Sequence, residues 1–175
     1  MVTNPKAMEL QETGKINYEW GTLWPHYHKE KMGWATGFRT KGDVDILFLS
    51  GSTGRNPFTD AAVVTHEDET ISKGNVVGGI REQTRQALTD IKDNLKMMGA
   101  SLKHIIMLRY YLTRREDFVD WKDETYSFFG EFEPDLLENP RPSTFLTEVG
   151  LGLPDMLVEI EAWAVIPRKK EGVKQ

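Results

Sequence analysis

Residues 157–166 constrain the fold most strongly, because their character alternates with a period of two. One side of this segment carries only apolar side chains: Val158, Ile160, Ala162, Ala164 and Ile166. Successive side chains of a β-strand point to opposite faces, so the pattern predicts a strand with one face on a core. Glu159 and Glu161 stand on the other face, and mid-strand carboxylates are costly to bury. That face is therefore expected either to be exposed to water or to be covered by another surface, in which case the two carboxylates have a functional role.

Length and composition indicate one soluble globular domain. A chain of 175 residues can bury a real core, and contents of 39% apolar and 28% charged residues are ordinary for such proteins. No apolar run approaches the length of a membrane span, and the N-terminus lacks the apolar region of a signal peptide. The absence of cysteine excludes disulfides and thiolate chemistry. We expect a cytoplasmic protein, and the net charge of −5 argues against nucleic-acid partners.

The rest of the chain predicts the element order β-β-α-β-α-β-β. Residues 1–30 read as an irregular N-terminal arm, and strands over 34–40 and 46–51 are expected to form a hairpin across a Lys-Gly-Asp turn. Apolar residues at helical spacing predict helices over 80–98 and 115–129, with a strand over 105–112 between them. Two final strands follow a Pro-rich segment, and residues 168–175 form a basic tail. The prediction is a single α+β domain over 31–167, with two helices on one face of a mixed sheet.

Two further stretches are candidates for a functional loop and a metal site. The polar segment 51–74 is long for a loop in a compact domain, and such loops are usually functional or mobile. The His26-x-His28 pair could share one side of a strand, but no acid in a suitable register completes a metal site. We therefore expect no metal and no other cofactor.

Several spaced blocks resemble the RidA/YjgF family, also called L-PSP endoribonuclease-like proteins. The resemblance runs from about residue 33 to 167 and rests on Leu-Ser-Gly at 49–51, the helix from Gln83 to Leu95, Tyr-Leu-Thr at 111–113 and Val-Glu-Ile-Glu-Ala-Trp-Ala-Val at 158–165. It implies the chorismate-mutase-like α+β fold. It also implies a homotrimer with a barrel-like centre, in which ligand clefts lie between neighbouring subunits.

The resemblance assigns expected roles to individual residues. RidA hydrolyses reactive enamines and imines derived from amino acids to 2-oxo acids and ammonia. By implication Glu159 positions or activates water, a general acid–base role. Ser50 and Gly51 match the family's ligand-touching Ser-Gly, and Trp34 stands in the place of a cleft tyrosine.

The chain departs from the family at the arginine that pairs with the substrate carboxylate. Aligned without gaps from the last strand, that place falls on Thr144, and a second register moves it to Ser143. Lys122 stands where a ligand-facing asparagine is found. The candidates for a replacement cation are Arg141, Arg55 and Lys122, and each has an alternative reading as an ordinary surface cation.

Three functions follow from these residues. The first, which we favour, is a hydrolytic deaminase of a small enamine or imine. The second is a non-catalytic trimer that binds a small metabolite in the same clefts. The third, an RNase or translation inhibitor, is disfavoured by the acidic balance of the chain. Glu159 and Glu161 also have a purely structural reading, as solvent-facing acids or partners across a subunit interface.

Overall fold

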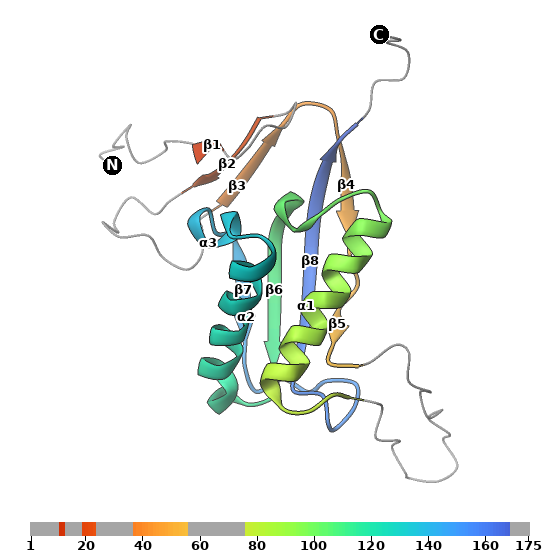
Figure 1. The fold of residues 1–175 in the computed structure, drawn as a ribbon, viewed down its shortest axis with the longest axis vertical. Coiled ribbons are helices and arrows are strands. Elements are labelled where there is room, and N and C mark those ends of the chain that lie inside the picture. The colour runs from red at the N-terminus through yellow and green to blue at the C-terminus, as the bar shows by residue number, and fades with distance from the viewer. Residues whose placement is uncertain (1–10, 13–18, 24–36, 56–75, 169–175) are drawn as a thin grey trace, which may run out of the picture.

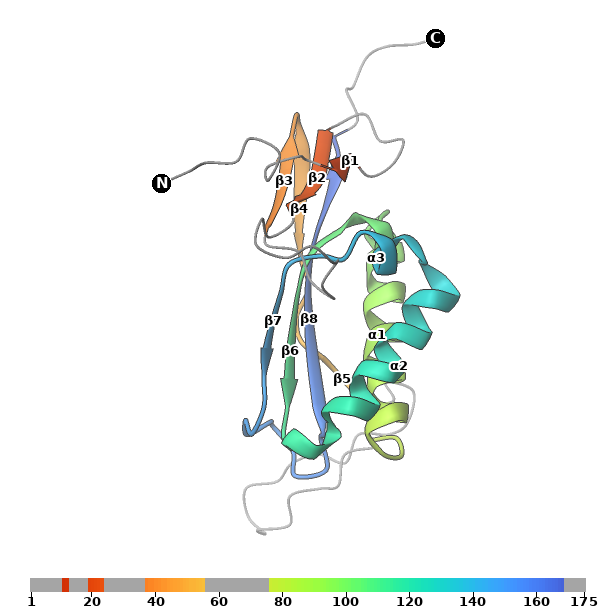
Figure 2. The same cartoon turned by 90° about the vertical axis from the view of Figure 1, so that its left-hand side faces the viewer.

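A computed structural model describes residues 11–12, 19–23, 37–55 and 76–168. Its main element is a five-stranded sheet in the order β4-β8-β6-β7, with β5 also paired to β8. Two long helices, α1 (Ile80–Met97) and α2 (Phe118–Phe132), lie together on one face of this sheet, as Figures 1 and 2 show. The predicted α+β arrangement is confirmed, with both helices on a single face.

The last strand, β8 (Val158–Pro167), lies at the centre of the sheet. It pairs antiparallel with β4 (Val44–Phe48), β5 (Ser52–Thr53) and β6 (Ile105–Leu112). The fifth strand, β7 (Ser143–Leu146), pairs parallel with β6, so the sheet is mixed. As the alternation predicted, the even-numbered residues of β8 face the core: Val158, Ile160, Ala162 and Ala164 are all fully buried.

Helix α1 packs its buried face against the core on one side of the sheet, and it ends where the sequence predicts. Its buried face includes Leu88, Ile91 and Leu95, which recur at helical spacing and are fully buried. Gly99 takes a φ of +77°, a left-handed conformation that glycine adopts without strain. The amide of Ala100 then donates to the carbonyl of Leu95 over 2.8 Å, which closes the helix with a Schellman turn.

The N-terminal part differs from the sequence-based prediction. Strands β1 (Gln11–Glu12), β2 (Glu19–Leu23) and β3 (Gly37–Lys41) form a separate three-stranded antiparallel sheet. The irregular arm predicted for residues 1–30 therefore contains strands, and the predicted hairpin is wrong, since β3 pairs with β2 and β4 pairs with β8. The predicted turn at Gly42 is confirmed, but a turn alone does not determine which strands pair across it.

Smaller differences lie around α2. The predicted helix over 115–129 begins as a 3₁₀ turn, η3 (Arg115–Asp117), and its α-helical part runs on to Phe132. The Pro-rich segment holds a short helix, α3 (Asp135–Glu138), that the sequence did not reveal. Within the described ranges, every helix is too short or too polar to cross a bilayer.

Candidate functional site

The sheet separates the sequence-predicted site residues into two groups on opposite faces. Glu159 lies on the face without helices, because its neighbours Val158 and Ile160 face the core. Thr144 shares that face, since it aligns with Arg109 on β6, which in turn aligns with Glu161 on β8. The side chains of Lys122, Arg141 and Ser143 instead line a cavity on the helix side.

The carboxyl group of Glu159 lies directly over Gly51. A Cβ placed on Gly51 would come within 2.6 Å of Glu159 Cδ and 2.8 Å of its Cγ, and closer still to Oε1. Burial, together with the charge of Glu161, raises the pKa of Glu159 above its ordinary value. Its titration thus moves toward neutral pH, where a carboxyl group can serve both as an acid and as a base.

Gln83 on α1 fixes the chain just before Glu159. Its side chain is 1% exposed and accepts the amide hydrogen of Leu157 over 2.8 Å. The same amide group donates to the carbonyls of Asp155 and Gly78, over 3.0 and 3.3 Å. Every polar group of this buried side chain is therefore satisfied, and the entry to β8 is tied to the helix layer.

Glu161 lies beside two polar residues of β6. Arg109 Nη1 and the Tyr111 hydroxyl each donate to Glu161 Oε2 over 3.4 Å. The Arg109 guanidinium also lies 5.0 Å from the centre of the Trp163 ring, a cation–π arrangement. Because these contacts are long and the Arg109 side chain is 37% exposed, the guanidinium keeps capacity for a further anion.

Arg109 was not among the candidates read from the sequence. In the alignment of β6 with β7 it lies directly opposite Thr144, the place where the RidA family arginine was sought. The segment of β6 showed the alternation of a strand, with Arg109 on the side opposite Leu108 and Tyr110. The sequence does not reveal that β6 lies between β7 and β8. This pairing brings Arg109 onto the same face of the sheet as Glu159.

The other candidates near Glu159 lie on or next to β5. Thr53 aligns with Glu159, and exposed Arg55 follows two residues later, after a bend at Gly54, in an isolated bridge to Val76. Ser50 is exposed beside Gly51. Trp34 lies outside the described residues.

Arg141 is held by the protein itself. Its Nε donates to the carbonyl of Ile105 over 2.8 Å, Nη1 donates to the carbonyl of Asn139, and Nη2 donates to the carbonyl of Lys103 over 3.3 Å. An ion pair to Asp135 at 3.5 Å completes its surroundings, and the side chain is fully buried. Lys122 is more open, at 40% exposure, with Asp123 3.8 Å away.

The face of the sheet that carries Glu159 also exposes apolar side chains. Ile46 and Phe48 on β4 are 55% and 63% exposed, and Leu146 on β7 is 46% exposed. Phe48 packs edge-on against Trp163, with ring centres 5.1 Å apart. In the described part of the chain, no group of three or more His, Asp or Glu side chains is placed to hold a metal ion.

Comparisons with known proteins agree on the family. The sequence profile of the family described as Endoribonuclease L-PSP matches residues 40–166. A RutC family protein of Pyrococcus horikoshii is 36% identical over 121 residues, which is 69% of this chain and 79% of the relative. The 3-aminoacrylate deaminase RutC of Acinetobacter baylyi is 33% identical over 125 residues, or 71% and 82% of the two chains.

A solved structure shows the same fold. YyfB of Yersinia pestis, a protein of unknown function of the Rid family, superimposes with a TM-score of 0.61 at 21% identity. The match covers 83% of this chain and 97% of that protein.

Proposed function

Because the chain belongs to the Endoribonuclease L-PSP family, the RidA/YjgF group, we propose that it is a hydrolytic deaminase of a small enamine or imine that carries a carboxylate. The observation that carries the proposal is the placing of Glu159 over Gly51, where burial raises the pKa of its carboxyl group. A relative of similar length is named as a deaminase of 3-aminoacrylate, an enamine with a carboxylate group, and this supports the substrate class.

Glu159 would handle the successive proton transfers of the reaction. In its protonated form it donates a proton to the enamine carbon, which gives the iminium ion. As a carboxylate it then takes a proton from water while the water oxygen bonds to the iminium carbon. Return of that proton to nitrogen lets the C–N bond break: the hydroxyl group formed from the water gives its proton to the carboxylate as the C=O bond forms, and ammonia leaves with the bonding electron pair. The products are one carbonyl compound and ammonia, and no oxidant or cofactor is consumed.

Arg109 would bind the substrate carboxylate. It is a cation on the face of Glu159, beside Thr144, and a guanidinium matches the two oxygens of a carboxylate. On adjacent antiparallel strands Arg109 is diagonal to Glu159, since it aligns with Glu161, two residues further along β8. Such diagonal neighbours lie about 7–8 Å apart at their Cα atoms, room for a small ligand between the two side-chain ends.

The cleft would be completed by a second copy of the chain. The face that carries Glu159 and Arg109 exposes Ile46, Phe48 and Leu146, and exposed apolar patches of this kind favour protein contacts. We therefore keep the homotrimer expected from the family as part of the proposal. Packing of copies on this face would exclude water around Glu159 and strengthen the charge interactions there.

A non-catalytic metabolite-binding trimer is the second candidate. Thr144 favours it, because a threonine cannot supply the charge that the family's arginine gives. In that case the same face would bind a small carboxylate through Arg109, without turnover.

Ammonia release separates the two candidates. Imines and enamines generated in situ by an amino acid oxidase or dehydratase are presented to the wild type, to Glu159→Gln and to Glu116→Gln, an exposed acid of η3 as the matched control. The deaminase requires faster ammonia release with the wild type and Glu116→Gln, and the uncatalysed rate with Glu159→Gln. The uncatalysed rate for all three proteins across the panel would support the binding protein instead.

A further inference from the structure

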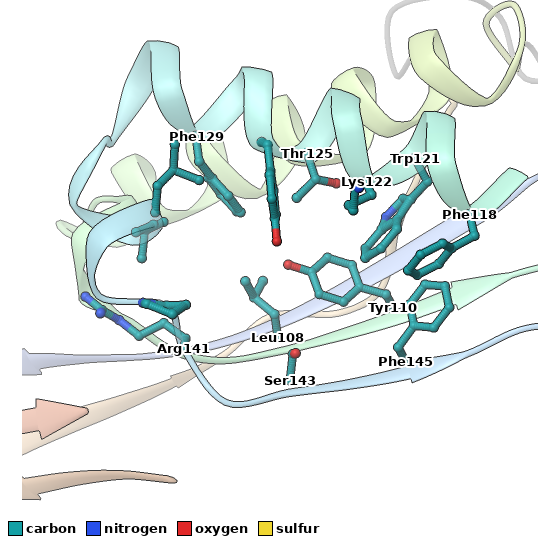
Figure 3. A pocket seen from close by; sticks show the side chains of 14 residues that line it. Leu108, Tyr110, Phe118, Trp121, Lys122, Thr125, Phe129, Arg141, Ser143 and Phe145 are labelled. Atoms are coloured by element: carbon teal, nitrogen blue, oxygen red, sulfur yellow. The ribbon is translucent and has the colours of Figure 1, made fainter. Parts of the chain in front are cut away.

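A cavity lies on the opposite side of the sheet from Glu159. It has a volume of about 690 Å³ and opens between α2, α3 and the strands β6 and β7 (Figure 3). Ligand pockets commonly measure about 300–1,000 Å³. Its walls are mainly aromatic, from Phe118, Trp121 and Phe129 on α2 and Phe145 on β7.

The aromatic rings of this cavity form an ordered wall. Trp121 and Phe145 lie with their ring centres 4.6 Å apart and their planes 35° apart. Phe118 closes the same end, 5.0 Å from Phe145 and 5.6 Å from Trp121. Such a wall presents flat faces, which suit a planar aromatic guest.

Buried polar groups in the wall lack partners. The Thr125 hydroxyl and the Trp121 Nε1 are buried, and neither has a hydrogen-bond partner among the described residues. Their side chains are 3% and 7% exposed, and Figure 3 shows Thr125 on the side of α2 that faces the sheet. Both atoms have almost no accessible surface, so they lie behind the cavity wall and the donors available to a ligand must come from other side chains.

The hydroxyl of Tyr110 is a neutral donor in the cavity lining. It points into the space between α2 and the sheet in Figure 3. Burial, with a smaller contribution from Tyr126, raises the pKa of Tyr110 well above its ordinary value, so its proton stays in place at neutral pH. The Ser143 hydroxyl points into the same space from β7.

The charge of the lining is positive. Lys122 and Arg141 are its ionised residues, and none of the described residues that line it is acidic. Arg141 already donates to three backbone carbonyls, so Lys122 is the cation with capacity for a ligand. The cavity therefore combines flat aromatic walls, neutral donors and one cation.

From this combination we propose that the cavity between α2 and β7 is a binding site for a small planar aromatic carboxylate. The ring packs against the cavity-facing sides of Trp121, Phe145 and Phe118, and the carboxylate meets Lys122 and the hydroxyls of Tyr110 and Ser143. This site is separate from the proposed deaminase site, because the sheet lies between the cavity and Glu159. This separation holds within one copy of the chain, and the Glu159→Gln variant below tests whether the two sites bind separate ligands.

Calorimetric titration with 2-naphthoate and with the neutral 2-naphthalenemethanol tests the site on the full chain. Lys122→Met keeps the apolar stem and removes the charge, and Lys96→Met on the exposed end of α1 is its control. Ser143→Phe narrows the cavity from an exposed strand position. Circular dichroism and melting temperature verify that each variant is folded.

The proposal expects the wild type and Lys96→Met to bind both probes. Lys122→Met should lose about tenfold in affinity for naphthoate and keep its affinity for the alcohol, because a hydrogen-bonded ion pair is lost. Ser143→Phe should reduce the binding affinity for both probes at least about tenfold, since the phenylalanine ring fills the space they need.

Three results would overturn it. The first is an absence of heat with the wild type at millimolar naphthoate. The second is equal naphthoate affinity in the wild type and Lys122→Met, which would remove the carboxylate from the ligand class. The third is loss of naphthoate binding in Glu159→Gln, which would place the probe on the other face of the sheet. That variant also separates the two sites, because it should lose deaminase activity and keep naphthoate binding.

Discussion

The carboxyl group of Glu159 occupies the space that a side chain on residue 51 would need. Gly51 follows β4, and Glu159 stands on β8, so the contact joins segments 108 positions apart in the chain. Glycine permits this approach because it has no Cβ. Gly51 itself stays exposed beside the carboxyl group.

Gly51→Ala should displace this carboxyl group without disturbing the backbone. The φ of Gly51 lies outside the left-handed region, so alanine fits the chain conformation, and the three atoms nearest to the added Cβ all belong to the Glu159 side chain. We expect kcat/KM for imine hydrolysis to fall about 100-fold, the effect of a displacement of roughly 1 Å at a reacting group. Gly150→Ala is the matched control, because a Cβ there has open space. Equal losses in both variants would mean that the displacement of Glu159 is not the cause.

Glu159→Gln should make the folded protein more stable at neutral pH. The pKa of Glu159 is raised in the folded state, chiefly by burial, so the native state holds this proton more tightly than the unfolded state. Wild-type stability is therefore lost as the pH rises from the unfolded pKa through the folded one, and the neutral amide removes that loss. Urea titrations should give the variant a larger free energy of unfolding than the wild type at pH 7. The difference should shrink as the pH falls toward the ordinary glutamate pKa of about 4.5. A variant less stable than wild type at pH 7 would contradict the direction of the shift.

Arg109→Met should reduce activity through substrate binding. Loss of a bidentate pair to a carboxylate costs about 2–3 kcal/mol, or roughly 30- to 150-fold in kcat/KM. Arg109→Lys should recover only part of this, because an ammonium lacks the planar fork of the guanidinium. Substrates without a carboxylate should be hydrolysed equally by all three proteins.

Arg55→Met provides the comparison for the same experiment. Arg55 is exposed near the end of β5 that faces Glu159, and its replacement should change kcat/KM less than threefold. If Arg55→Met lost activity and Arg109→Met kept it, the carboxylate would have to be assigned to Arg55.

Phe48→Asp should separate the proposed trimer. Phe48 is 63% exposed on the face that carries Glu159, and a charge there would be buried without a partner between copies. Light scattering should report a trimer for wild type and a monomer for Phe48→Asp. Val119→Asp is the control, because Val119 is equally open, at 58%, but lies on α2. A trimeric Phe48→Asp would place the subunit contact elsewhere.

The sequence predicted the elements whose patterns are local. The period of two in β8 and the helical spacing of Leu88, Ile91 and Leu95 each depend on burial of one face, and both predictions are confirmed. The two registers considered for the family arginine place it on different faces of the sheet. Thr144 lies on the face of Glu159, whereas Ser143 faces the helices.

Features that depend on pairing between distant strands could not be predicted. Arg109 lies near Glu159 only because β6 pairs with β8, and no local pattern states that partnership. The same reason explains the wrong hairpin, since β3 pairs with β2. Arg141 was a candidate for binding the ligand. Its position in the sequence, close to Thr144, does not reveal that its guanidinium already donates to the backbone carbonyls of Ile105 and Asn139.

The pH dependence of imine hydrolysis tests the role of Glu159 most directly. Rates are measured between pH 4 and 8 for wild type and Glu159→Gln, with the uncatalysed rate subtracted. Our account predicts a wild-type profile with a limb set by a carboxyl pKa above the ordinary value, and no enzyme-dependent rate in Glu159→Gln. A variant with the same rate and the same limb as the wild type would show that another group carries the proton.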